Sequence, residues 1–327
     1  MNRMKTMRKQ FFAMAAVAAA LTLGACSSEE EAQVEPARQI TVSTEIGAMS
    51  RVATDAEGAQ RFEEGDVISV YAWTGTDREG IIVAPAKDSR VVDNSHNTLV
   101  GGSWVAAPQM LWRNMQEKHY FIGVYPAIEQ GSGLDDDLTR YAYTLRPGDE
   151  EASDLLVAVQ TDGILAGYGS VPLAFTHVMA KVSVNLTFRN QWGLDEAGNN
   201  RVPEVSSVQL LNAAGQATVD LLTKGVTPAG ESRAAQTLTE LSENKQYGSV
   251  VIPQDGVRQI AVVVGGKRYT YTHGSDISLA GGKVTTINLT IGRDVVSPGD
   301  VTVDPWDDSA DPIDGEAADP DGNADGI

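Results

Sequence analysis

The chain contains one cysteine, Cys26, and four histidines among 327 residues. A single cysteine excludes an intramolecular disulfide and a metal site built from several thiolates. The histidines lie far apart, and none has the HExxH or related spacing of a zinc site. The sequence also lacks a GxSxG nucleophile elbow, a P-loop and a GxGxxG loop. We therefore expect a protein without catalytic metal, cofactor or enzyme activity.

Positive charge is scarce, because 25 Lys and Arg residues stand against 44 Asp and Glu residues, a formal net charge of −19. Four of the basic residues precede residue 11, which leaves 21 in the rest of the chain. No run of clustered Lys and Arg follows, so nucleic acid is excluded as a partner. The acidic balance instead favours solubility and mutual repulsion between molecules.

Long apolar runs are absent apart from residues 11–23, which follow the basic start and precede Gly24, Ala25 and Cys26. This order is typical of a bacterial lipoprotein signal, and the run is shorter than the ~20 residues that cross a bilayer. We predict a signal peptide over residues 1–25 and a lipidated Cys26 that anchors the protein through acyl chains. The acidic cluster at residues 29–31 resembles the surface-export signal of Bacteroidetes lipoproteins, which implies an exposed outer-membrane location.

Amphipathic helical patterns are absent, whereas short strand-like runs with β-branched residues recur along the chain. The runs cover residues 39–44, 66–73, 119–125, 155–160, 171–188, 205–211, 249–252, 257–264, 267–272 and 283–291. The pair Gly265-Gly266 between two runs predicts a tight hairpin. Many short strands separated by turn signals predict an all-β fold of sandwich type.

The composition along the chain predicts a tether, two domains and a tail. A polar stretch without periodicity predicts an acidic tether over residues 26–38. A glycine-rich stretch near residues 167–170 separates two predicted sandwich domains, residues 39–169 and 170–303. The segment 304–327 has nine acids and no Lys or Arg, which predicts an acidic flexible tail.

The tail contains the first half of a calcium loop, with Asp321, Asn323 and Asp325 at the oxygen-ligand positions and Gly326 at the sixth. The printed sequence ends before the bidentate carboxylate at position twelve. We therefore expect weak or absent calcium binding and interpret these residues as part of a solvated acidic tail.

Aromatic and acidic residues leave two alternatives open. The five tryptophans offer a sugar-stacking surface, so one alternative is a monomeric, anchored glycan-binding lipoprotein. Core packing is the competing interpretation for those that lie in or beside strand patterns. A hydrolase would need a pair of carboxylates that converge in a cleft, and the sequence singles out no such pair.

Several motifs along the chain together resemble the fimbrillin family of Bacteroidales lipoproteins, which build or cap type V pili. They are residues 62–71, 120–126, 153–158, 173–182, Tyr269 with 281–284, and 303–306. The resemblance implies two tandem transthyretin-like β-sandwich domains and a structural or adhesive role in a fimbrium. It also implies other pilus subunits as partners, alongside the outer membrane and a host or bacterial surface ligand.

The resemblance further implies that an arginine-specific protease cuts after the first strand, and that a strand from a neighbouring subunit fills the resulting groove. Ile40, Val42 and Thr44 alternate as such a removable strand should. Arg51 follows small residues and is the predicted cleavage site, with Arg61 as the second choice. The competing interpretation is that Arg51 is a surface charge only.

One feature departs from the family pattern. Polymerising members need a donor strand, and the tail beyond Trp306 is too acidic and too rich in proline to pair well in a sheet. The stretch 295–303 is the alternative donor, although Pro298 and Gly299 interrupt it. This departure speaks against a stalk role and keeps a tip, accessory or anchor role open.

Overall fold

A computed structural model describes residues 39–47, 61–75, 87–129, 137–167, 169–199, 201–293 and 296–306. Its regular structure is almost entirely β, as the sequence predicts. Four single helical turns occur in the described residues, η1 (Lys87–Ser89), α2 (Glu150–Ser153), η2 (Asn190–Trp192) and η3 (Gly230–Ser232). None of the described helices is long and apolar enough to cross a membrane.

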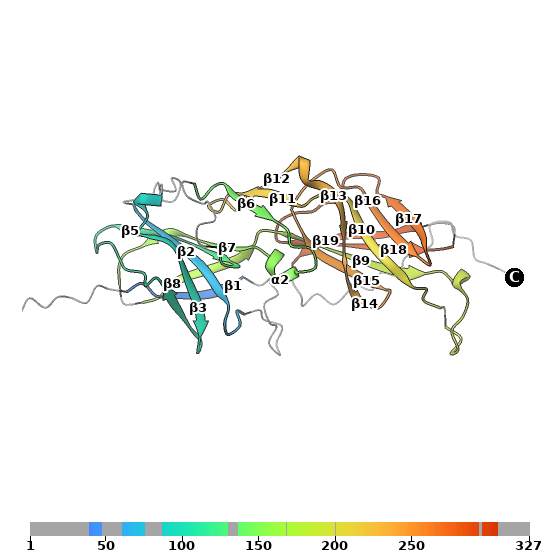
Figure 1. Ribbon diagram of the computed structural model, residues 1–327, viewed down its shortest axis with the longest axis horizontal. Coiled ribbons are helices and arrows are strands. Elements are labelled where there is room, and N and C mark those ends of the chain that lie inside the picture. The colour runs from blue at the N-terminus through green and yellow to red at the C-terminus, as the bar shows by residue number, and fades with distance from the viewer. Residues whose placement is uncertain are drawn as a thin grey trace, which may run out of the picture. The chain divides into compact units, whose positions relative to one another are not determined.

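A seven-stranded sheet forms the first half, in the order β1-β8-β7-β5-β2-β3-β4. Figure 1 shows its strands in blue and green. Its strands are β1 (Val42–Ile46), β2 (Val67–Gly75), β3 (Val92–Val100), β4 (Ser103–Ala107), β5 (Lys118–Tyr125), β7 (Leu156–Ile164) and β8 (Val171–His177). Strands β1 and β8 pair in parallel, and the other neighbours pair antiparallel. The first strand of the chain is therefore an edge strand of this sheet.

Two further sheets form most of the second half. One has the order β14-β15-β9-β18-β19, and the other has the order β13-β10-β16-β17. The first contains β14 (Thr239–Ser242), β15 (Gln246–Val251), β9 (Ala180–Phe188), β18 (Lys283–Ile291) and β19 (Val296–Pro305). The second contains β13 (Arg233–Thr237), β10 (Val205–Ala214), β16 (Gln259–Val264) and β17 (Lys267–Thr272). The last strand, β19, is again an edge strand.

A three-stranded sheet joins segments from both halves of the sequence. It consists of β12 (Val226–Pro228), β11 (Gln216–Val219) and β6 (Tyr141–Thr144), with β11 in the middle. The carboxylate of Glu150 also accepts a hydrogen bond from the Val250 N–H at 2.5 Å. The boundary between residues 169 and 170 stays a prediction, and both of these contacts cross it.

The buried side chains form three clusters. The first-strand core gathers Ile40, Val42, Phe62, Phe175 and their neighbours on the seven-stranded sheet. The shared core takes side chains from both halves of the sequence, including Trp306. The third cluster fills the space between the two sheets of the second half.

Two local predictions have clear outcomes. The hairpin is confirmed, because Gly265 and Gly266 have φ values of 55° and 77° and join the paired strands β16 and β17. The prediction of one continuous strand over residues 171–188 is wrong. The chain leaves the strand at Val178, whose N–H donates to the Leu155 carbonyl at 2.9 Å, and β9 then begins in another sheet.

Candidate functional site

Residues 39–47, which contain β1, are held to the fold by main-chain hydrogen bonds along both sides of the segment. The Val171 N–H of β8 donates to the Thr41 carbonyl at 2.8 Å, and the Gly47 N–H donates to the Phe175 carbonyl at 3.0 Å. On the other side, the Ile40 N–H donates to the Met110 carbonyl at 2.9 Å. A strand that left this position would expose these unpaired backbone groups.

The predicted removable strand also carries core side chains. Ile40 is 1% exposed and Val42 is 6% exposed, and both belong to the first-strand core. Their neighbours on β8 include Leu173 and Phe175, which are 1% and 0% exposed. Burying an aliphatic side chain of this size contributes roughly 1.5–3 kcal/mol. Loss of β1 would therefore uncover an apolar groove as well as an open sheet edge.

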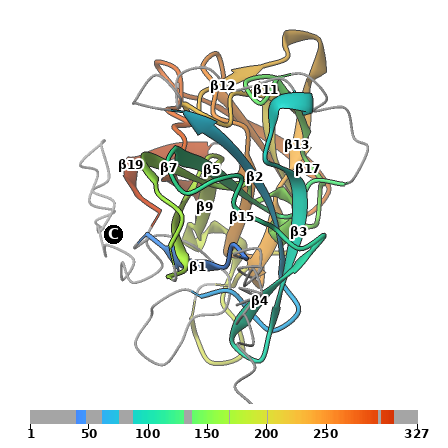
Figure 2. The same cartoon turned by 90° about the vertical axis from the view of Figure 1, so that its left-hand side faces the viewer.

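Thr44 is the third member of the predicted set, and it makes a polar contact. The Trp104 Nε1–H of β4 donates to the Thr44 Oγ1 at 3.0 Å. The two residues lie at opposite edges of the seven-stranded sheet, so the sheet curls until its edges approach one another (Figure 2). The structure thus brings all three predicted strand residues to one site.

Phe62 closes the site from the segment that precedes β2. Its ring lies 5.2 Å from the ring of Trp104, 5.3 Å from that of Tyr125 and 5.2 Å from that of Phe175, each in an edge-on arrangement. Edge-on aromatic pairs contribute about 0.5–1.5 kcal/mol each beyond area burial. Phe62 is therefore firmly fixed in the first-strand core.

A carboxylate cluster holds the residues that follow Phe62. The Tyr125 hydroxyl donates to Glu151 Oε1 at 2.7 Å and to Asp66 Oδ1 at 3.3 Å. The Glu63 N–H donates to Asp66 Oδ2 at 2.7 Å. Burial raises the pKa of the Asp66 carboxyl above its ordinary value, although these hydrogen bonds oppose that shift. Burial and the hydrogen bond to Glu151 also raise the pKa of Tyr125.

The structure describes only one of the two predicted cleavage residues. Arg61 is exposed, but the bond that follows it leads directly into buried Phe62. Arg51 lies outside the described residues, as do Cys26 and the calcium candidates Asp321, Asn323 and Asp325. All of these remain predictions.

The stretch predicted as an alternative donor forms β19. It pairs antiparallel with β18 from Val296 to Pro305, and the register shifts between Ile287 and Leu289. At this bulge a Cβ on Gly299 would lie 3.1 Å from the Asn288 carbonyl oxygen, a tight contact that glycine avoids. The interruption predicted at this glycine is a β-bulge within an edge strand.

The chain stays ordered beyond the predicted start of the acidic tail at residue 304. Strand β19 continues to Pro305, and Trp306 is 1% exposed in the shared core. Sequence reasoning placed this tryptophan in the tail because acids and prolines surround it. The rest of the predicted tail lies outside the described residues.

The histidines contact nearby backbone and side-chain groups. His177 Nδ1 lies 2.6 Å from Asp154 Oδ1, and His96 Nε2 lies 2.8 Å from the Ile128 carbonyl. His119 is buried, and burial lowers its pKa. In the part of the chain that the structure describes, no group of three or more His, Cys, Asp or Glu side chains is placed to hold a metal ion.

No tryptophan presents a freely exposed ring. Trp73 and Trp306 are buried, and Trp104, Trp112 and Trp192 are partly buried. Sugar stacking needs an accessible ring face, so this arrangement gives no support to the glycan-binding alternative.

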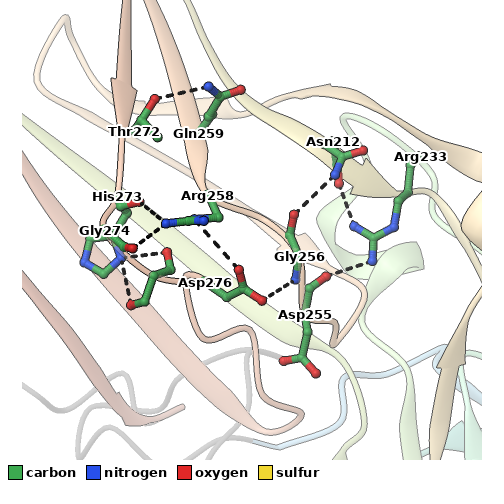
Figure 3. A network of polar contacts seen from close by, with 11 residues as sticks. Asn212, Arg233, Asp255, Gly256, Arg258, Gln259, Thr272, His273, Gly274 and Asp276 are labelled. Atoms are coloured by element: carbon green, nitrogen blue, oxygen red, sulfur yellow. Dashed lines mark hydrogen bonds and ion pairs between the residues drawn. The ribbon is translucent and has the colours of Figure 1, made fainter.

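A second polar cluster lies in the second half (Figure 3). The Arg233 guanidinium donates to the carbonyls of Asn212 and Asp255 at 2.8 and 2.7 Å. The Gly256 N–H donates to Asp276 Oδ2 at 3.0 Å. The Arg233 and Asp276 side chains thus bind backbone groups of Asp255 and Gly256, and the cluster fixes the turn before β16.

Comparison with known proteins identifies the family of the chain. The profile of the fimbrillin-like family matches residues 50–306. The chain belongs to the fimbrillin-like family. The match begins after β1 and ends at Trp306.

Solved structures share the fold of this fimbrillin-like chain. A candidate cell adhesion protein from Bacteroides ovatus has a TM-score of 0.60 and 18% identity, over 83% of this chain and 98% of that one. Another from Bacteroides uniformis has a TM-score of 0.57 and 16% identity, over 82% and 98%. A fimbrial protein from Bacteroides vulgatus has a TM-score of 0.51 and 13% identity, over 82% and 99%. No curated protein matches the chain in sequence.

Proposed function

We propose that the chain is a structural or adhesive subunit of a cell-surface pilus, assembled by strand exchange after proteolytic removal of β1. The observation that carries this proposal is the position of β1. It is an edge strand, yet its Val42 and the preceding Ile40 are buried in the first-strand core. Membership of the fimbrillin-like family supports the pilus context. The fimbrial and adhesion proteins of similar fold agree with it.

The precursor is a lipoprotein in this proposal. Cleavage before Cys26 leaves a lipidated cysteine that holds the chain at the outer membrane, facing outward. The sequence around Cys26 supports this step. The tether then leads directly to β1, so the anchor and the removable strand lie on the same side of the cut.

The cut itself falls after Arg51. A protease must draw several residues on each side of the bond away from the fold. Cleavage after Arg61 would require Phe62 to leave its contacts with three aromatic rings. The family match also begins at residue 50, so β1 lies outside the shared part of the chain, as suits a segment that is discarded.

Removal of β1 would open the edge of β8. A strand from a neighbouring subunit then binds there, pairs with the exposed backbone groups and buries alternate side chains over Leu173 and Phe175. This makes the chain an acceptor of a foreign strand. Its position as stalk, tip or anchor depends on whether it also donates one.

N-terminal sequencing and intact mass of the protein sheared from its native cells test the proposal. A start at Val52 supports cleavage after Arg51, and a start at Phe62 supports the same assembly with the second cleavage site. A mature form that retains lipidated Cys26 and β1 would refute removal of the strand. Such a form would leave an anchored lipoprotein.

A further inference from the structure

The side chains that residues 40–46, β1 and the two residues before it, direct into the fold differ from one another in polarity. Ile40 and Val42 are buried in the first-strand core, and Ile46 packs against it. Thr44 lies between them in the same alternating row, and its hydroxyl accepts the hydrogen bond of the Trp104 indole. One polar position therefore interrupts an otherwise apolar row.

We infer that Trp104 sets the register of the strand that fills this site, and that it selects strands with a hydrogen-bond acceptor at the Thr44 position. The inference rests on the proposed exchange of β1. Because the side-chain period is two, a strand that slides by two residues keeps the same face inward, so an apolar row alone does not distinguish these two registers. The single indole N–H distinguishes the positions, because any other register leaves a partly buried donor without its partner.

The required partner is a strand of the form apolar-x-apolar-x-acceptor-x-apolar, where the acceptor is the side chain of Ser, Thr, Asn or an acid. Residues 40–46 follow this form. The end of strand β19 starts to follow this form, because Val301 and Val303 have the spacing of Ile40 and Val42. The next position of that row, which corresponds to Thr44, is Pro305. A proline side chain offers the indole no acceptor.

No other stretch from residue 289 to residue 327 satisfies the form either. Residues 289–327 of a second copy of this chain are therefore a poor match to the site. The partner that fits the site is a strand of the stated form, and residues 289–327 do not supply one.

Peptide competition tests the inference on the complete chain. A site for a sequence-specific protease is placed within residues 48–56, and the chain is cut there so that β1 stays bound without a covalent link. The nicked protein is incubated with an equimolar mixture of two peptides of residues 39–47, wild type and Thr44→Val. Mass spectrometry of the intact complexes then gives the ratio of the bound peptides.

We expect the wild-type peptide to be bound in about threefold to tenfold excess, the range of one neutral hydrogen bond. A Thr44→Ser peptide retains the hydroxyl and should compete with the wild-type peptide. A Ser43→Ala peptide is the matched control, because Ser43 is exposed. In a Trp104→Phe protein, which retains an aromatic ring beside Phe62, the preference for threonine over valine should disappear.

Each failure has a different meaning. Equal binding of the Thr44 and Thr44→Val peptides to the wild-type protein would overturn the role of Trp104 and leave strand exchange intact. A peptide of residues 297–306, which places Pro305 at the Thr44 position, would overturn the requirement for an acceptor if it bound as well as the β1 peptide. If no peptide enters the nicked protein at all, both this inference and the proposed function fail.

Discussion

The indole of Trp306 lies flat on the imidazole of His177, with 4.0 Å between the ring centroids and 12° between the ring planes. His177 ends β8, the strand that pairs with β1, and Trp306 directly follows β19. The stack therefore connects the last described residue to the sheet that contains the candidate site. The Lys181 ammonium adds a contact, 5.5 Å from the centre of the Trp306 ring.

Substitution Trp306→Ala should lower the free energy of unfolding by about 3–5 kcal/mol, because it empties a buried aromatic site in the shared core. Denaturant unfolding followed by circular dichroism measures this loss. Leu194→Ala is the control, since Leu194 is 63% exposed and its removal should change stability by less than about 0.5 kcal/mol. A Trp306→Ala protein as stable as the control would show that the ring is not packed as described.

Substitution Gly123→Ala should destabilise the first-strand core by about 1–3 kcal/mol. A Cβ at this position of β5 would lie 2.7 Å from the Phe175 ring and 3.1 Å from the Leu173 side chain. Phe175 must then shift, and with it the surface on which β1 rests. Gly274→Ala is the matched control, because an added Cβ there meets no atom within 4 Å. Equal unfolding midpoints for the two variants would contradict the packing.

The strands that the sequence predicts are those whose apolar residues alternate or run together. Residues 267–272 and 283–291 were predicted with the bounds that β17 and β18 have. Strand β3 was missed because its inward positions include Ser95 and Asn97, which are 0% and 1% exposed. Their polar groups are bonded inside the sheet, for example the Ser95 hydroxyl to the Pro108 carbonyl at 2.7 Å, and no polarity pattern reveals that pairing.

At the candidate site, too, the sequence predicts the local strand pattern but not the long-range contacts. The alternating pattern predicts that Ile40, Val42 and Thr44 lie on one face of a strand. In the structure all three side chains of this face lie at the candidate site. The partner of Thr44 is Trp104, sixty positions along the chain. Curling of a seven-stranded sheet creates this contact, and a local pattern has no access to it. The contact between the two edges of the sheet is thus the part of the site that the sequence does not predict.

Acid should weaken the fold through His119. Its Nε2 accepts a hydrogen bond from the Arg113 N–H at 3.2 Å, and its Nδ1 lies 3.1 Å from the Glu117 carbonyl, so the neutral ring with a proton on Nδ1 fits both partners. Burial lowers its pKa below 6.5, hence the unfolded chain binds the proton more readily. The free energy of unfolding should therefore fall as the pH drops from about 6.5 to the lowered pKa of the folded state.

A His119→Gln variant isolates this contribution. The glutamine carbonyl retains an acceptor for the Arg113 N–H but does not titrate, while the other three histidines remain in both proteins. The difference in unfolding free energy between wild type and variant, measured at pH 7.5 and pH 5, should move against the wild type at the lower pH. A difference that is the same at both values would contradict the lowered pKa.

Arginine variants in the native cells separate the two cleavage sites. Arg51→Gln should block removal of β1, because Arg61 is then the one arginine left in the sequence between β1 and β2, and the residue that follows it is buried among three aromatic rings. Surface protein from these cells should retain residues 26–51 and should not enter polymers. Arg61→Gln leaves the preferred bond intact, so its product should match the wild type in N-terminal sequence and assembly. The reverse pattern, with Arg61→Gln alone blocking maturation, would mean that Phe62 leaves the first-strand core before the cut, and that the groove opens wider than removal of β1 alone requires.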